Sequence, residues 1–160
     1  MIAPLHLCYA TVTGNAESLA RRAYDRALNA GLAARLHNLS ELSPADLADA
    51  ATALFIVSTW GDGEPPADAA DFFADLLGDG APALGSLRYA VLGLGDRDYP
   101  EFNACARQLD ERLAALGARS LLPRVEADLQ FEETYAEWEA RVFPLLVAPS
   151  DAPVSAQAST

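Results

Sequence analysis

The residues best suited to chemistry in this sequence lie in three short segments, each of which follows an apolar run. The first, 11–17, reads Thr-Val-Thr-Gly-Asn-Ala-Glu and contains hydroxyls and a glycine but no cation. A helix that begins here would present unpaired backbone amides and a partial positive charge, to which two threonine hydroxyls add donors. The segment therefore predicts a phosphate site, although the same residues also fit an ordinary helix N-cap.

The other two segments each place a large aromatic residue beside glycines and acids. Segment 58–66 reads Ser-Thr-Trp-Gly-Asp-Gly-Glu-Pro-Pro, and segment 94–103 reads Leu-Gly-Asp-Arg-Asp-Tyr-Pro-Glu-Phe-Asn. Trp60 and Tyr99 offer flat faces on which a planar ligand could stack. A turn with a half-buried tryptophan explains the former segment equally well, and a helix entry at Pro100 explains part of the latter.

Taken together, the three segments describe one site, with a phosphate at a helix start and a planar ring between Trp60 and Tyr99. Flavin mononucleotide (FMN) has this shape. The Walker phosphate motif is absent, and Gly93-Leu94-Gly95 lacks the third glycine of a dinucleotide-binding fingerprint.

Composition excludes several other classes of function. The chain has 160 residues, 23 acidic and 11 basic, with a formal charge of -12, and every basic residue is an arginine. The absence of lysine excludes a P-loop lysine and a Schiff base, and the acidic balance argues against nucleic-acid binding. Cys8 and Cys105 form no Cys-x-x-Cys pair, so neither a zinc site nor a dithiol motif is expected.

The elements that must position these segments alternate along the chain. Apolar runs predict buried strands at 5–10, 53–58 and 89–94, with weaker strands at 34–39 and 119–125. Between and after them, apolar residues recur at a helical period, so we expect strand and helix to alternate about five times. This pattern predicts an α/β three-layer sandwich, a five-stranded parallel sheet with helices on both faces. Ligands of such sheets bind beyond the carboxyl ends of the strands, where the three segments fall.

The helical patterns are marked by four apolar stripes. Their members are Leu19, Ala23 and Ala27; Phe72, Phe73, Leu76 and Leu77; Phe102, Ala106, Leu109, Leu113 and Leu116; and Tyr135, Trp138, Val142 and Leu145. We expect one domain over residues 1–147 and a disordered tail over 148–160, which is small, polar and aperiodic. No apolar run reaches the length of a membrane span and no secretory signal is evident, so a cytoplasmic location is expected.

The three segments together resemble the flavodoxin family, most closely the FMN-binding domain of diflavin reductases such as cytochrome P450 reductase and the sulfite reductase flavoprotein. The likeness extends to about Leu146 and includes Leu92-Gly93-Leu94-Gly95-Asp96 and a closing helix with Trp138 and Arg141. It implies the flavodoxin-like strand order 2-1-3-4-5. Many relatives have Gly-Ser-Gln-Thr-Gly where this chain has residues 10–14, Ala-Thr-Val-Thr-Gly, so a glycine and a polar side chain are missing. With no long insertion in the last strand, the short-chain type is expected.

The resemblance also implies roles for individual residues. Residues 11–16 would bind the phosphate, Trp60 and Tyr99 would flank the isoalloxazine ring, and Gly61 would offer its backbone to the flavin N5. Asp128 falls where related domains carry an acid near the cofactor. The expected cofactor-binding residues are Thr11, Val12, Thr13, Gly14, Asn15, Ala16, Ser58, Thr59, Trp60, Gly61, Asp62, Gly63, Leu94, Gly95, Asp96, Arg97, Asp98, Tyr99, Phe102, Asn103 and Asp128. No residue is expected to be catalytic in the acid-base sense, and no metal is expected.

The function implied is that of a monomeric FMN electron carrier that moves single electrons at low potential. Its donor would be an NADPH-dependent flavin reductase with a basic face, and its acceptor a redox enzyme. Acids near the second and third segments would form a negative rim that steers such partners: Asp62, Glu64, Asp68, Asp71, Asp75, Asp96, Asp98 and Glu101. Two alternatives remain open, an NAD(P)H-dependent flavin or quinone reductase on the same fold and an FMN-binding accessory module without turnover.

Overall fold

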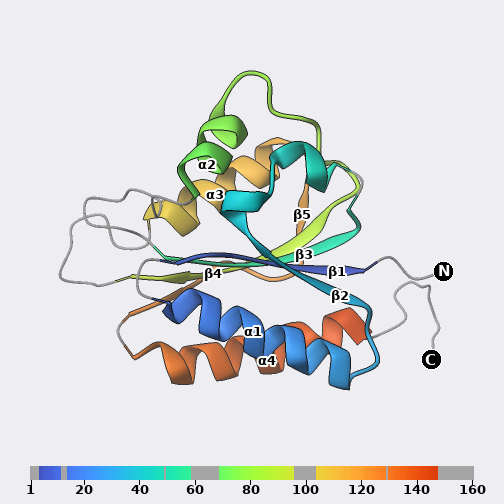
Figure 1. Cartoon of the computed structure of the whole chain (residues 1–160), viewed down its shortest axis with the longest axis vertical. Helices are drawn as coiled ribbons and strands as arrows, with labels where there is room; N and C mark the ends of the chain where they lie inside the picture. The colour runs from blue at the N-terminus through green and yellow to red at the C-terminus, as the bar shows by residue number, and fades with distance from the viewer. Residues whose placement is uncertain are drawn as a thin grey trace.

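A parallel β-sheet forms the middle layer of the molecule (Figure 1). The computed structural model describes residues 4–11, 14–48, 50–58, 69–95, 104–128 and 130–147. The four long strands are β1 (Leu5–Ala10), β2 (Ala34–Asn38), β3 (Thr52–Ser58) and β4 (Arg88–Leu94). With the short β5 (Arg119–Ser120), the strands lie in the order β2-β1-β3-β4-β5, and every pairing is parallel. The predicted strand order is thus confirmed.

The central strands are apolar because both faces of the sheet are covered. In β3 every residue from Ala53 to Ser58 is buried, and in β4 every residue from Tyr89 to Leu94. Side chains alternate between two cores, so that Leu54 and Ile56 face one side whereas Phe55 and Val57 face the other. Such continuous apolar strands are typical of a parallel sheet inside a sandwich.

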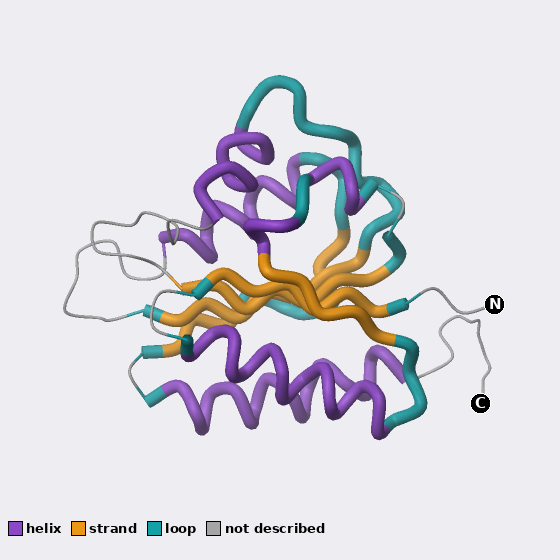
Figure 2. Tube along the Cα trace, in the orientation of Figure 1, coloured by secondary structure: helices purple, strands orange, loops and turns teal. Residues whose placement is uncertain are grey.

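The helices form two outer layers (Figures 1 and 2). Helices α1 (Asn15–Asn29) and α4 (Phe131–Val147) cover one face and are tied together by an ion pair between Arg26 and Glu139, with an N···O distance of 2.8 Å. Helices α2 (Ala70–Leu77) and α3 (Ala104–Ala115) cover the other face. No helix within the described ranges is long and apolar enough to cross a membrane.

The four predicted apolar stripes mostly face the cores, with two exceptions. Leu77 and Leu145 were expected on the buried faces of α2 and α4, yet they are 47% and 40% exposed. Leu77 ends α2 next to the buried Leu76, and Leu145 lies in the last turn of α4 next to Leu146, which packs against a core. Phe102, from the third stripe, lies outside the described residues.

The connection from β2 to β3 differs from the predicted strand-helix alternation. Instead of an α-helix it holds two 3₁₀ turns, η1 (Leu39–Glu41) and η2 (Pro44–Leu47). Asn38 caps the first through its side chain, and Pro44 at the start of the second cannot donate a backbone hydrogen bond to an earlier turn. Short capped turns replace the helix here, while Leu39 and Leu47 still supply the buried contacts that a helix would make.

The last predicted strand, 119–125, is split into β5 (Arg119–Ser120) and β6 (Val125–Ala127). Both pieces pair with β4, so one edge position of the sheet is filled in two steps. Between them, Pro123 lacks an N–H, and the Ser120 hydroxyl donates to the Leu122 carbonyl. This local hydrogen bond and the proline interrupt the ladder, which explains the difference from the continuous strand predicted.

Candidate functional site

The turn between β1 and α1 is the best-defined part of the candidate site. The backbone N–H of Gly14 donates to Thr11 Oγ1, with an N···O distance of 2.8 Å. Gly14 has φ of 92°, in the left-handed region that favours glycine, and a Cβ built there would meet nothing within 4 Å. The backbone conformation at residue 14 therefore requires a glycine, whereas crowding does not, because the space around a Cβ would be open. The chain turns sharply here into α1.

The first turn of α1 leaves backbone donors available to a ligand. The N-cap residue, Gly14, has no side chain that could cap the helix, and the first backbone bond of the helix runs from Ser18 N–H to the Gly14 carbonyl, at 3.0 Å. The amides of residues 15–17 precede that bond, so the helix itself does not pair them. Such a helix end can bind an anion, and the phosphate site at this position stays a prediction.

The carboxyl ends of the other central strands lie at the same edge of the sheet. The strand registers align Ala10 with Val57, and Ser58 with Leu94. Ser58 is the last residue of β3 and the one buried polar residue among those described, 8% exposed. On the next strand, the Gly95 N–H donates to the Ala127 carbonyl at 2.9 Å, which brings Asp128 to this edge. The sheet thus brings the starts of the three predicted segments, together with Asp128, to one end.

The structure describes only part of the predicted site. Eight of the expected residues are described and lie along this edge: Thr11, Gly14, Asn15, Ala16, Ser58, Leu94, Gly95 and Asp128. The remaining thirteen fall outside the described residues: Val12, Thr13, Thr59, Trp60, Gly61, Asp62, Gly63, Asp96, Arg97, Asp98, Tyr99, Phe102 and Asn103. The ring sandwich between Trp60 and Tyr99 therefore stays a prediction.

The two cysteines are buried thiols within the cores. Burial raises the pKa of both Cys8 and Cys105 far above the usual thiol range, so neither supplies a thiolate at neutral pH. The parts of the chain that the structure describes contain no group of three or more His, Cys, Asp and Glu side chains able to hold a metal ion.

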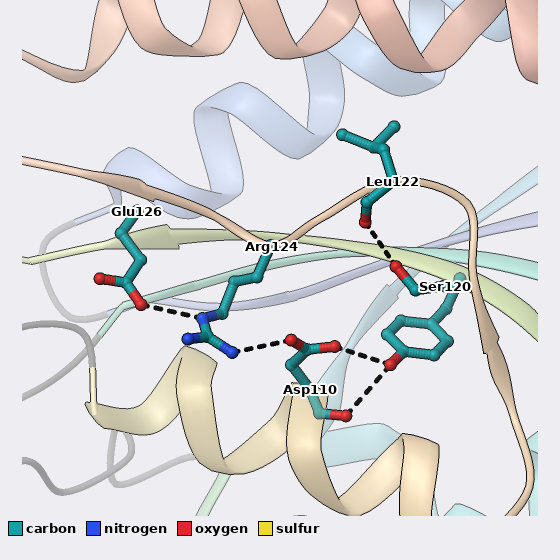
Figure 3. Close-up of polar contacts among 6 residues, drawn as sticks. Asp110, Ser120, Leu122, Arg124 and Glu126 are labelled. Atoms are coloured by element: carbon teal, nitrogen blue, oxygen red, sulfur yellow. Dashed lines mark hydrogen bonds and ion pairs between the residues drawn. The ribbon is translucent and has the colours of Figure 1, made fainter.

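Sequence reasoning missed a polar cluster beside β6. Arg124 contacts Asp110 of α3 and Glu126 of β6, while Tyr89 of β4 donates to Asp110 (Figure 3). The alternation in Arg124-Val125-Glu126 could have placed the arginine and the glutamate on one face of a strand. Nothing in the local sequence points to Asp110 as their partner, because it lies fourteen residues earlier on a helix.

The strand order and the helix start at the carboxyl edge define a flavodoxin-like protein, and comparisons of sequence agree. The family model described as flavodoxin matches residues 7–139. The chain therefore belongs to the flavodoxin family.

Among similar proteins are sulfite reductase [NADPH] flavoprotein alpha-components. That of Neisseria meningitidis serogroup C / serotype 2a is 41% identical over 133 residues, which are 83% of this chain and 22% of the relative. That of Bacillus subtilis is 39% identical over 130 residues, 81% of this chain and again 22% of the relative. The chain thus spans about a fifth of the length of these relatives.

Solved structures of single-domain flavodoxins match over most of their length. A short-chain flavodoxin associated with a non-canonical PDU bacterial microcompartment superposes with a TM-score of 0.75 at 29% identity, covering 87% of this chain and 93% of the other. A flavodoxin from Streptococcus pneumoniae TIGR4 gives a TM-score of 0.75 at 31% identity, with 86% and 92% covered. These matches agree with the short-chain type expected from the sequence.

Flavodoxins bind FMN and transfer electrons, and this chain is an FMN-binding electron-transfer module of that family. The described residues fit the cofactor's phosphate. The start of α1, whose N-cap Gly14 has no side chain, can offer its first amides to a dianion, and the Thr11 hydroxyl accepts the Gly14 N–H beside them. No lysine is needed, and none exists in the chain.

Proposed function

We propose that this protein carries single electrons at low potential between a reductase and an acceptor protein, with residues 1–147 as its FMN-binding domain. The observation that carries the proposal is the shared edge of the sheet, where α1 begins at Gly14 beside the carboxyl ends of β3 and β4. The first amides of α1 would hold the phosphate at this edge, and the segments that follow β3 and β4 would surround the ring.

The roles of individual residues follow from this placement and from the family resemblance. Thr11 and the first amides of α1 would hold the phosphate, which is the end of FMN that takes no part in electron transfer. Trp60 and Tyr99 would flank the ring, and the Gly61 backbone would face the flavin N5. Asp128 would lie near the cofactor, since its neighbour Ala127 is hydrogen-bonded to Gly95.

FMN supplies the redox chemistry when bound, and the protein's work is to bind, orient and shield it. Hydrogen bonds from backbone groups and nearby acids would set the relative stability of its charge states. In this proposal no side chain donates or removes a proton as a catalytic acid or base.

The partners follow from chemistry and from the relatives' name. An NADPH-dependent flavin reductase with a basic face would be the donor, because this chain has a formal charge of -12. The relatives that it resembles are flavoprotein components of an NADPH-linked sulfite reductase, so a sulfite reductase is one acceptor to test. We further infer a monomer in the cytoplasm, a reducing compartment that suits two buried thiols.

Mixing the FMN-loaded protein with NADPH separates this proposal from its main alternative. A carrier should keep its oxidised spectrum with NADPH alone and lose it when a flavodoxin reductase is added. Rapid bleaching by NADPH alone would instead identify a flavin or quinone reductase. If no reductase reduced the bound flavin, the protein would be an accessory module without turnover.

A further inference from the structure

Four side chains form a cluster that joins β4, α3 and β6 (Figure 3). Strand β6 lies beside the carboxyl end of β4, where FMN is expected to bind. Arg124 Nη1 lies 2.7 Å from Asp110 Oδ2 on α3, and Arg124 Nε lies 2.8 Å from Glu126 Oε2 on β6. The Tyr89 hydroxyl, on β4, donates to Asp110 Oδ1 at 2.6 Å. One guanidinium therefore bridges two carboxylates, and the tyrosine holds one of them from the other side.

The cluster is largely shielded from water, which strengthens its contacts. The side chains of Arg124, Asp110 and Glu126 are 22%, 20% and 29% exposed. Burial, followed by the hydrogen bond to Asp110, raises the pKa of Tyr89 far above its usual value, so the phenol stays protonated and remains a donor. Charge-assisted hydrogen bonds with this little exposure are stronger than surface ion pairs.

The segment that the cluster holds is a short edge strand, whose Val125 and Ala127 pack into the core beneath α4. Strand β6 is three residues long and lies at the sheet edge, directly after the break at Pro123. Short edge strands open more readily than central ones, because they have backbone partners on one side only. Arg124 provides an attachment to α3 where the β-ladder provides none.

Backbone contacts connect β6 to the carboxyl end of β4, where the FMN site is expected. Glu126 aligns with Gly93 and Ala127 with Leu94 of β4. The Ala127 carbonyl accepts the Gly95 N–H at 2.9 Å, and Asp128 follows at once. Any shift of β6 away from β4 would therefore move Gly95 and Asp128, both of which belong to the expected FMN site.

We propose that Arg124 is a positioning residue for the FMN site, which fixes Gly95 and Asp128 by tying β6 to Asp110 of α3. This proposal rests on the proposed FMN function, but the attachment of β6 to α3 can be measured in FMN-free protein. The described partners of Arg124 are Asp110 on α3 and Glu126 on β6, so its influence would pass through these two elements.

The test compares Arg124→Met with Arg112→Met, a matched control on α3, the helix to which Arg124 is tied. Arg112 also bridges elements, donating to the Leu76 and Gly78 carbonyls at 2.8 and 2.9 Å, on the side of α3 that faces α2. Both variants should lose some stability. Only Arg124→Met should weaken FMN binding, by about tenfold, and shift the one-electron midpoint potentials.

A second measurement uses FMN-free protein. Hydrogen exchange at the Gly95 amide should quicken by about tenfold in Arg124→Met and stay unchanged in Arg112→Met. Unchanged exchange in Arg124→Met would overturn the positioning role even if FMN binding were weakened, whereas wild-type protein that bound no FMN would overturn the proposed function instead.

Two milder variants can test the same proposal if Arg124→Met does not fold. Glu126→Gln retains the Arg124 contact to Asp110 and should give intermediate changes in FMN affinity and Gly95 exchange. Arg124→Lys keeps the charge but cannot span both carboxylates, so it should restore only part of the affinity. Wild-type values in Glu126→Gln, or equal losses in the Arg112 control, would contradict a positioning role.

Discussion

At the scale of single residues, the phosphate end of the site depends on a small set of backbone and hydroxyl groups. Thr11 orients its hydroxyl by accepting the Gly14 N–H, and Gly14 adopts a conformation that favours glycine. Neither residue carries charge. If these residues hold the phosphate as proposed, recognition would depend on the geometry of the turn, and small substitutions should have measurable effects.

Replacing Thr11 by valine tests the hydroxyl. Valine matches threonine in shape but cannot accept the Gly14 N–H, so the turn should loosen and FMN should bind about fivefold more weakly, equivalent to roughly 1 kcal/mol. Thr52→Val is the control, because Thr52 begins β3 at the opposite end of the sheet. Titration of FMN fluorescence measures both, and equal affinities in the two variants would contradict the assigned role.

Replacing Gly14 by alanine tests the backbone conformation. The substitution meets no steric obstacle, so its cost should be that of the left-handed backbone alone, about 1 to 2 kcal/mol of unfolding free energy. Gly80→Ala is matched, since its Cβ also has open space but its φ is not positive. Urea unfolding should separate the two, and a similar loss in both would show that Gly14 is not conformationally required.

At the scale of elements, the edge strand β2 is joined to β1 by both histidines of the chain. His6 Nδ1 and His37 Nε2 lie 3.0 Å apart, a distance at which one nitrogen must donate and the other accept. Burial first, and then nearby positive charge, lowers the pKa of each imidazole below the usual 6.5. Protonation of both rings would break this hydrogen bond.

The histidine pair predicts a dependence of stability on pH. Because the folded pKa values lie below the unfolded one, the unfolded chain binds more protons, and the stabilisation is complete above pH 6.5. It should be lost progressively as the pH falls below that value. Urea unfolding between pH 7.5 and 5.5 should show the decline, and His6→Gln/His37→Gln should flatten it. An unchanged slope in the double variant would assign the decline to other groups.

Prediction from sequence succeeded where a local pattern determines an element. The run Leu5–Ala10 and the helix start after Gly14 are predicted by residues within a few positions. The β2–β3 connection and the split at Pro123 were missed, because turn capping and one proline overrode weak periodicity. The Arg124 cluster was missed for another reason, since its partners come from β4, α3 and β6 and meet only after folding.

At the scale of the whole molecule, charge and topology act together. The topology gathers loops at one edge of the sheet, and the chain carries a formal charge of -12 without any lysine. Asp71 and Asp75 of the predicted acidic rim are described and lie exposed on α2. The other six acids of the rim lie outside the described residues, and their grouping around the flavin edge stays a prediction.

Encounter with a basic partner should therefore be sensitive to ionic strength. Opposite charges accelerate association, and salt screens them over about 8 to 10 Å at ordinary concentrations. The second-order rate of reduction by a flavodoxin reductase should fall several-fold between about 20 and 500 mM salt. Stopped-flow measurements check this, with potentials measured at each salt concentration as the control. A rate that does not change with salt would contradict steering.

We propose that electrons pass one at a time through the FMN that this chain binds. An anaerobic reductive titration of the FMN-loaded protein, followed by its visible spectrum, tests that claim directly. We predict stoichiometric FMN and two separate one-electron steps at low potential. A chain that ignores added FMN, or whose bound FMN takes both electrons in one step, would contradict it.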